Sequence, residues 1–137
     1  MSSYRSIGIG LLGLGVVGSG VARTLWKKGD ALGSQVGCPL VLKRILVRHP
    51  AKKRAVQVEP HLITTQAQDI LQDPTIDIVV EVMGGESPAR EYIEQALKEG
   101  KNVVTANKEV MAKQGPELLA LAREKGVELR YEASVGG

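Results

Sequence analysis

The stretch Gly13-Leu14-Gly15-Val16-Val17-Gly18 decides how this chain is expected to fold. It has the spacing GxGxxG and lies between an apolar, strand-like segment over residues 5–12 and a segment with helical periodicity over residues 16–28. The absence of a side chain lets Gly13 turn tightly, lets a phosphate approach Gly15, and lets the helix pack closely at Gly18. A turn that binds no ligand would have the same spacing, but a GxGxxG turn between a strand and a helix favours a dinucleotide pyrophosphate at the helix start.

Strands and helices are expected to alternate along the rest of the chain. Four further strands are expected, over residues 40–47, 76–83, 102–106 and 127–133; the first is rich in Val and Leu, and the second is almost continuously apolar. The helices between them have three expected features: an N-cap at Thr64 or Thr65, an N-cap at Ser87 with Pro88 in the first turn, and a break near Gly115-Pro116. This order predicts an α/β fold of the Rossmann type, with a doubly wound parallel sheet in a single domain over residues 1–137.

Composition excludes several other classes of protein. The 137 residues are 43% apolar and 24% charged, which is sufficient for a buried core, and that core must be aliphatic because there is no Phe and only one Trp. So few aromatic residues argue against single-stranded nucleic acid as a partner. Residues 6–22 carry no charge, but six glycines make them a poor apolar helix, so we expect neither a signal peptide nor a membrane span. Cys38 is the only cysteine, which favours a reducing, cytoplasmic location.

A basic segment follows the second expected strand. Residues 43–54 contain six Lys or Arg and no acidic residue, a pattern that most often marks a solvated surface. Where an NAD-selective site usually has an acidic residue, this chain has Arg48, whose guanidinium could bind a 2′-phosphate. We therefore predict a preference for NADP, and NAD is the alternative. The other interpretation of Arg48 is a solvated surface residue that binds no ligand. A nucleic-acid-binding domain that uses this segment is a further, weaker alternative.

Two later motifs lie where strands are expected to end, at the edge of the sheet that lines ligand crevices. Glu81-Val82-Met83-Gly84-Gly85 ends the third expected strand, and its paired glycines would allow close approach of a ligand to the backbone. Val104-Thr105-Ala106-Asn107-Lys108 ends the fourth, and a partly desolvated lysine there could take part in proton transfer. For the first motif, a turn that binds no ligand remains the other interpretation. For the second, it is a surface lysine at the start of a helix.

Taken together, the motifs at 13–21, 79–85, 103–108 and 131–137 are similar to those of homoserine dehydrogenases, in the same order. The chain resembles the N-terminal NAD(P)-binding domain of that family. The resemblance implies NAD(P)-linked interconversion of L-homoserine and L-aspartate 4-semialdehyde, a step of threonine, methionine and isoleucine biosynthesis.

The resemblance also implies roles for particular residues. Lys108 would lie beside the nicotinamide and the substrate as the catalytic lysine. The loop that ends the chain would bind a monovalent cation, most simply sodium, through oxygen atoms of Glu132, Val135 and Gly137, which suits a hard cation. With the glycine turn and Arg48, the expected cofactor-binding residues are Gly13, Leu14, Gly15, Val16, Val17, Gly18, Arg48, Gly84, Gly85, Thr105 and Lys108.

The chain departs from the family in where it ends. In the family, the motif at 131–137 continues into a substrate and dimerisation domain, so we expect this chain to be a fragment that binds cofactor without turning over homoserine. A small-molecule substrate and a homo-oligomeric state are expected of the complete enzyme, and neither nucleic acid nor a membrane is expected as a partner. The alternatives are another reductase of the aspartate pathway on the same fold, and a non-catalytic module that senses a nucleotide.

Overall fold

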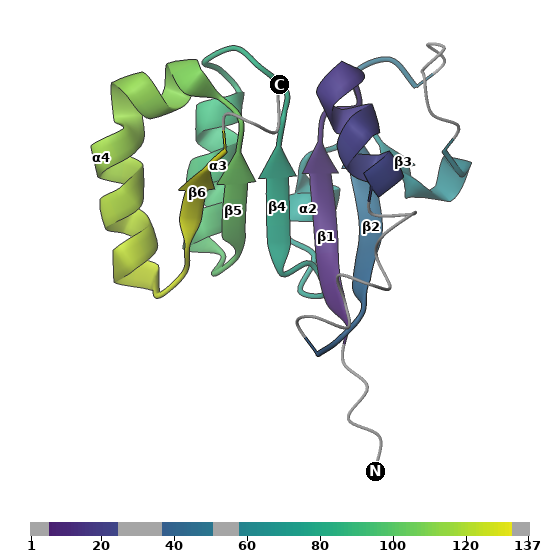
Figure 1. Ribbon diagram of the computed structural model, residues 1–137, viewed down its shortest axis with the longest axis horizontal. Helices are drawn as coiled ribbons and strands as arrows, with labels where there is room; N and C mark the ends of the chain where they lie inside the picture. Colours follow the sequence, from purple (N-terminus) through teal and green to yellow (C-terminus); the bar gives the residue numbers. More distant parts are fainter. Residues whose placement is uncertain (1–5, 25–36, 51–57, 133–137) are drawn as a thin grey trace.

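The computed structural model describes residues 6–24, 37–50 and 58–132. Within these ranges the strands form one six-stranded sheet in the order β3-β2-β1-β4-β5-β6, and every neighbouring pair is parallel. Figure 1 shows the arrows of β1, β4, β5 and β6 pointing the same way, with their carboxyl ends along one edge. The bounds are β1 Ile7–Leu12, β2 Leu40–Leu46, β3 Ile63–Thr64, β4 Ile78–Glu81, β5 Asn102–Thr105 and β6 Leu129–Tyr131.

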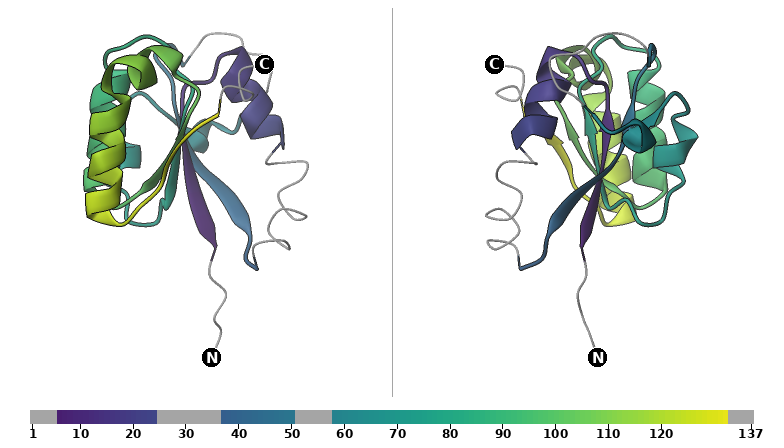
Figure 2. Two further views of the ribbon diagram at one scale, coloured as in Figure 1. Left: turned by 60° about the vertical axis from the view of Figure 1, so that its left-hand side comes forward. Right: turned by 90° about the vertical axis from the view of Figure 1, so that its right-hand side faces the viewer.

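Helices cover both faces of this sheet. The described helices are residues 16–24, α2 (Gln68–Leu71), α3 (Ala89–Lys98) and α4 (Lys108–Lys125), and a 3-10 turn, η1, spans Pro60–Leu62. Figure 2 shows residues 16–24 on one side of the sheet and α3 and α4 on the other. The prediction of a doubly wound α/β fold of the Rossmann type is therefore confirmed.

The core is aliphatic and divided by the sheet into two clusters. Because successive side chains of a strand point to opposite faces, Leu11 of β1 packs in one cluster and Leu12 in the other. The cluster under α2, α3 and α4 includes Ile93 and Leu97, which are fully buried. The smaller cluster lies under residues 16–24, where Ala22 is the fully buried helical residue. These two layers hold the sheet edge on which the candidate site is built.

Two expected N-caps are wrong. Thr64 lies in β3, a short strand that the sequence pattern did not predict, and it pairs with Leu46 of β2. The N-cap of α2 is Ala67, which makes no side-chain capping bond. The N-cap of α3 is Pro88, and the Ser87 hydroxyl donates to the Glu91 carboxylate at 2.9 Å. Ser87 and Pro88 lie in a turn before Ala89, the first helical residue, so Pro88 takes the N-cap position and no side chain caps the helix.

The expected helix break near Gly115-Pro116 is also wrong. Helix α4 runs from the N-cap Asn107 to the C-cap Gly126 with Pro116 inside it. Buried residues on both sides of the proline, Val110 and Leu118 among them, anchor the helix to the core. This packing offsets the hydrogen bond that proline removes, and the usual consequence is a bend, which α4 shows between its first turns and the rest (Figure 1).

Candidate functional site

A cavity of about 610 Å³ lies at the carboxyl edge of the sheet. Its walls come from the glycine turn after β1, the end of β2, the segment after β4 and the start of α3. From β1 the chain continues to β2 and β3 on one side of the sheet and then returns to β4 on the other side of β1. The strand order therefore reverses at β1. Ligands of open α/β sheets bind at this kind of reversal, outside the carboxyl ends of the strands.

The glycine turn is held by close backbone contacts. Gly13 has a φ of 108°, and its N–H donates to the carbonyl oxygen of Leu46 at 3.0 Å. A Cβ on Gly18 would lie 2.3 Å from the carbonyl oxygen of Gly13, closer than any real contact allows. Glycine is therefore required at Gly18 because the first helical turn packs directly on the turn that precedes it.

Gly15 meets a different requirement. The Ser19 N–H donates to the Gly15 carbonyl at 2.8 Å, which makes Gly15 the N-cap of the helix over residues 16–24. No atom lies within 4 Å of the position that a Cβ on Gly15 would take. The side chain of Val16 is 91% exposed. The helix start, with its free N–H groups and partial positive charge, is thus open to an anionic ligand, as a pyrophosphate site requires.

Arg48 follows β2 at the wall of the same cavity. It is exposed, and the cavity is also lined by His49 and, from the segment after β3, by Thr65. Arg48 and the glycine turn therefore line the same cavity. Lys52, Lys53 and Arg54 of the basic segment lie outside the described residues.

The loop after β4 carries the paired glycines. Gly84 and Gly85 have φ values of 75° and 76°, the left-handed region that favours glycine. The Asn107 side-chain amide donates to the Gly85 carbonyl at 2.6 Å. Glu86, next in the loop, bonds the Lys113 ammonium at 2.7 Å, which lowers the pKa of Glu86 and raises the pKa of Lys113. The loop is thus tied to α4 at two consecutive residues.

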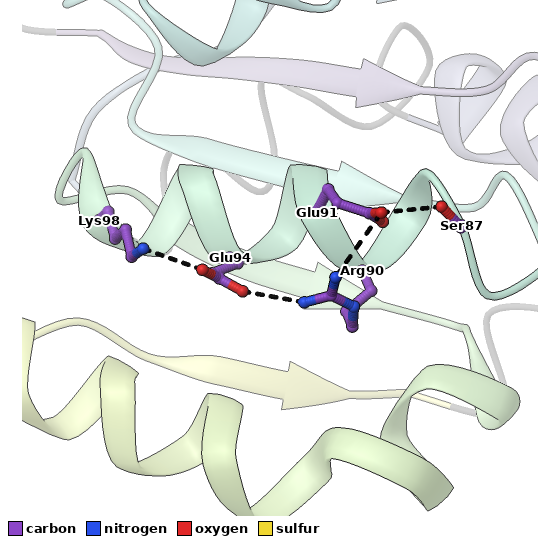
Figure 3. Close-up of polar contacts among 5 residues, drawn as sticks. All are labelled: Ser87, Arg90, Glu91, Glu94 and Lys98. Atoms are coloured by element: carbon purple, nitrogen blue, oxygen red, sulfur yellow. Dashed lines mark hydrogen bonds and ion pairs between the residues drawn. The ribbon is translucent and has the colours of Figure 1, made fainter.

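Helix α3 leaves this loop with a row of charged contacts on its surface. Figure 3 shows Glu94 between Arg90 at 3.0 Å and Lys98 at 2.9 Å, and Glu91 between the Ser87 hydroxyl and Arg90. The Lys98 hydrogen bond lowers the pKa of Glu94, and the Ser87 hydrogen bond lowers the pKa of Glu91. Such exposed pairs stabilise a helix by only a few tenths of a kcal/mol each. These contacts run along the surface of α3, and none of their residues lines the cavity.

A buried polar network joins the ends of β4 and β5. Glu81 and Thr105 are completely buried, and Asn107 is 5% exposed. The Thr105 hydroxyl donates to the Glu81 carboxyl group, and the Asn107 amide lies within hydrogen-bonding distance of the same group. Sequence reasoning assigned no role to Glu81. The signal was present, since an acidic residue ended an otherwise apolar strand.

Lys108 and Glu132 lie at the same edge of the sheet but outside the cavity wall. Lys108 is the first residue of α4 and is exposed. Glu132 follows β6, where its N–H donates to the Thr105 carbonyl at 2.9 Å and its carboxylate lies 3.9 Å from the Arg130 guanidinium. Val135 and Gly137, the other expected cation ligands, lie outside the described residues. Among the described residues, no cluster of three His, Cys, Asp or Glu side chains could hold a metal ion.

Fold and site together define a dinucleotide-binding α/β domain: a glycine turn at the strand reversal, an open helix start and a cavity beside them. Residues 13–132 match the family model described as the homoserine dehydrogenase NAD binding domain. The chain belongs to this family, as the resemblance of its motifs indicated.

Known relatives support this assignment. The chain is 47% identical over 97% of its length to a homoserine dehydrogenase of Bacillus subtilis and 45% identical over 96% to one of Synechocystis. The crystal structure of S. aureus homoserine dehydrogenase at pH 7.5 has a TM-score of 0.88 and 41% identity over 95% of the chain. The chain spans about a third of the length of these proteins, 31% of the first and 34% of the third.

No helix of the described residues is long and apolar enough to cross a membrane. Cys38 is a free cysteine in the described part of the chain.

Proposed function

We propose that this chain binds NADP in the cavity beside the glycine turn and serves the reaction of a homoserine dehydrogenase, the interconversion of L-homoserine and L-aspartate 4-semialdehyde. The observation that carries the proposal is Arg48 at the wall of a cavity that begins at Gly13 and Gly15. A pyrophosphate on the helix start would put the adenosine ribose near the end of β2. A guanidinium there favours a 2′-phosphate, whereas NAD selectivity usually depends on an acidic residue.

The residues present fit a nicotinamide dinucleotide. The open space at Gly15 suits a pyrophosphate close to the backbone, and Gly84 and Gly85 expose backbone at the neighbouring strand end. When bound, the cofactor would supply or accept a hydride. In this proposal Lys108, exposed at the start of α4, moves the proton of the alcohol, and Glu132 with Val135 and Gly137 holds a monovalent cation such as sodium.

The proposal extends to the whole protein. Since the chain spans about a third of the length of its relatives, homoserine binding and assembly into a homo-oligomer would depend on regions outside the matched third. A cytoplasmic location and a place in threonine, methionine and isoleucine biosynthesis belong to the same proposal. An NADPH complex is known for an archaeal homoserine dehydrogenase with the same fold, at 22% identity and a TM-score of 0.75.

The test compares the affinities of NADPH and NADH for the wild-type chain and for Arg48→Ala. Loss of a charged hydrogen-bonding partner should weaken NADPH roughly tenfold or more, while NADH changes by less than about twofold. Titration followed by the fluorescence of the reduced nicotinamide measures both. Arg123→Ala is the matched control, because Arg123 is exposed in the last turn of α4, at the opposite edge of the sheet (Figure 1). Equal losses for both cofactors, or for both variants, would refute the role of Arg48.

A further inference from the structure

The hydrogen bonds of the buried network have only one consistent set of directions. The Thr105 hydroxyl oxygen accepts the Asn107 backbone N–H at 3.0 Å, so its single hydrogen is free to point at Glu81. The Asn107 side-chain oxygen accepts the Val110 N–H at 3.0 Å, so its amide hydrogens point at Gly85 and Glu81. Every neighbour therefore donates to the carboxyl group of Glu81.

The Glu81 carboxyl group fits this arrangement because it can accept on both oxygens. One oxygen takes the Thr105 hydroxyl, and the other takes the Met83 N–H at 2.9 Å and lies 3.4 Å from the Asn107 amide nitrogen. Buried polar groups are stable only when such partners are present, and loss of one partner leaves a donor unsatisfied. The network consequently fixes the rotamers of its members and the backbone at Met83.

The network connects two segments at the carboxyl edge, which are joined at the surface by the Glu86–Lys113 ion pair as well. Through Met83 and Asn107 it holds the loop at Gly84 and Gly85, whose left-handed backbone has no side chains to anchor it. Through the N-cap bond of Asn107 it fixes the first turn of α4, which begins at Lys108. Figure 1 shows this loop and the start of α4 next to each other above β4 and β5.

The position of this edge identifies the part of a ligand that it meets. Arg48 and the end of β2 lie on one side of the glycine turn, and β4 and β5 lie on the other. With a 2′-phosphate near Arg48 and a pyrophosphate on the helix start, the nicotinamide half of the dinucleotide extends over the ends of β4 and β5.

We propose that Glu81 is a positioning residue for the nicotinamide half of the cofactor. It acts through Thr105 and Asn107, which together set the Gly84–Gly85 backbone and the first turn of α4 at Lys108. The inference rests on the proposed binding of NADP. It assigns a role to a residue that does not itself contact the ligand.

The test compares two ligands that differ in the nicotinamide ring: NADPH, which carries it, and 2′-phospho-ADP-ribose, which does not. The variant Glu81→Gln keeps the size of the side chain but replaces one acceptor oxygen with a donor. Asn107→Ser keeps a good helix N-cap but removes the amide bond to Gly85. Isothermal titration of the 137-residue chain gives both affinities, and their ratio measures what the nicotinamide half contributes.

In both variants we expect NADPH to weaken about fivefold or more, as for loss of one buried hydrogen bond, while 2′-phospho-ADP-ribose changes by less than about twofold. Val103→Ala is the control for lost stability, since Val103 is buried in β5 and its side chain makes no hydrogen bond to the network. A general loss of stability would change both ligands together, and Val103→Ala would reproduce it.

The outcomes separate this inference from the proposed function. If the wild-type chain binds neither ligand, the proposed function fails and the inference fails with it. If it binds both ligands and the affinity ratio is the same in the variants as in the wild type, or if the nicotinamide adds no affinity to the wild type, the positioning role alone is refuted. Should Glu81→Gln not fold, Asn107→Ser decides the question.

Discussion

Two glycines of the same motif should differ in how the same substitution changes the stability of the chain. The contact geometry separates Gly15, where a methyl group would project into open space, from Gly18, where it would overlap the Gly13 carbonyl. We predict that Gly15→Ala impairs cofactor binding with little change in stability, and that Gly18→Ala impairs both.

The magnitude for Gly18→Ala follows from the overlap. The methyl carbon would lie 2.3 Å from the Gly13 oxygen, whereas ordinary contact begins at 3.4 Å, so the helix start has to shift by about 1 Å. Overpacking of this kind costs about 1–3 kcal/mol, and the better helix propensity of alanine returns up to about 1 kcal/mol. A net loss of about 1–2 kcal/mol corresponds to a fall in Tm of about 3–8 °C for a domain of this size.

For Gly15→Ala the stability terms nearly cancel. Alanine is a poorer N-cap than glycine, but it restricts the unfolded chain, and each effect is about 0.5–1 kcal/mol. The methyl group would nonetheless occupy the space beside the helix start where a pyrophosphate has to approach. We expect the affinity for NADPH to fall at least about tenfold, the equivalent of about 1.4 kcal/mol.

Thermal unfolding followed by far-ultraviolet circular dichroism measures the first effect, and NADPH titration measures the second. The reasoning is wrong if Gly15→Ala lowers Tm as much as Gly18→Ala does, because the two positions would then be equally crowded. It is also wrong if Gly15→Ala binds NADPH as the wild type does, because the ligand would then not approach this backbone.

Two further predictions concern stability. The hydroxyl and N–H of Thr75 donate to Asp73 at 2.7 and 2.8 Å, and the hydroxyl contributes most to lowering the pKa of Asp73 in the folded chain. Because the pKa of Asp73 is lower in the folded chain, this hydrogen bond contributes stability above the pKa of the unfolded carboxyl, near 4. That contribution is lost as the pH falls through the lower pKa of the folded chain. Asp73→Asn should therefore flatten the decline of the urea midpoint below about pH 4. Ile93→Ala, at a fully buried position in α3, should lower the free energy of unfolding by about 2–5 kcal/mol in urea titrations. The exposed Leu119→Ala on α4 is its control and should change that free energy by less than about 0.5 kcal/mol; equal effects of the two would contradict the assigned core.

Much of the fold was predictable because its signals are local. The alternation of strand-like and helix-like segments predicted β1, β2, β4, β5 and β6, and the spacing of Gly13, Gly15 and Gly18 predicted the turn between the first strand and the first helix. Strand β3 was missed because two residues are too few to show a period, and because Thr64 has the local character of a cap. Pairing with β2, a contact between segments distant in the sequence, decided its conformation.

Helix α4 shows the same limit. The Gly115-Pro116 pair is a strong local signal for a break, and the helix continues through it because buried residues on both sides hold it to the core. A local rule cannot weigh burial that depends on where α3 and β5 lie. The N-cap at Asn107 has a related basis, since its amide is oriented by groups from two other segments.

By itself, the sequence determined the class of fold, the place of the ligand edge and the family, because strand period, glycine spacing and short motifs are properties of neighbouring residues. Only the tertiary structure decided that Glu81, Thr105 and Asn107 form one network, since 24 and 26 residues separate the partners of Glu81 along the chain. The different requirements at Gly15 and Gly18 were expected from the glycine spacing, and the structure agrees with them: Gly15 is open and Gly18 is crowded. The physical reason is that the hydrogen bonds of this network depend on which atoms meet when parallel strands bring segments distant in the sequence to one edge.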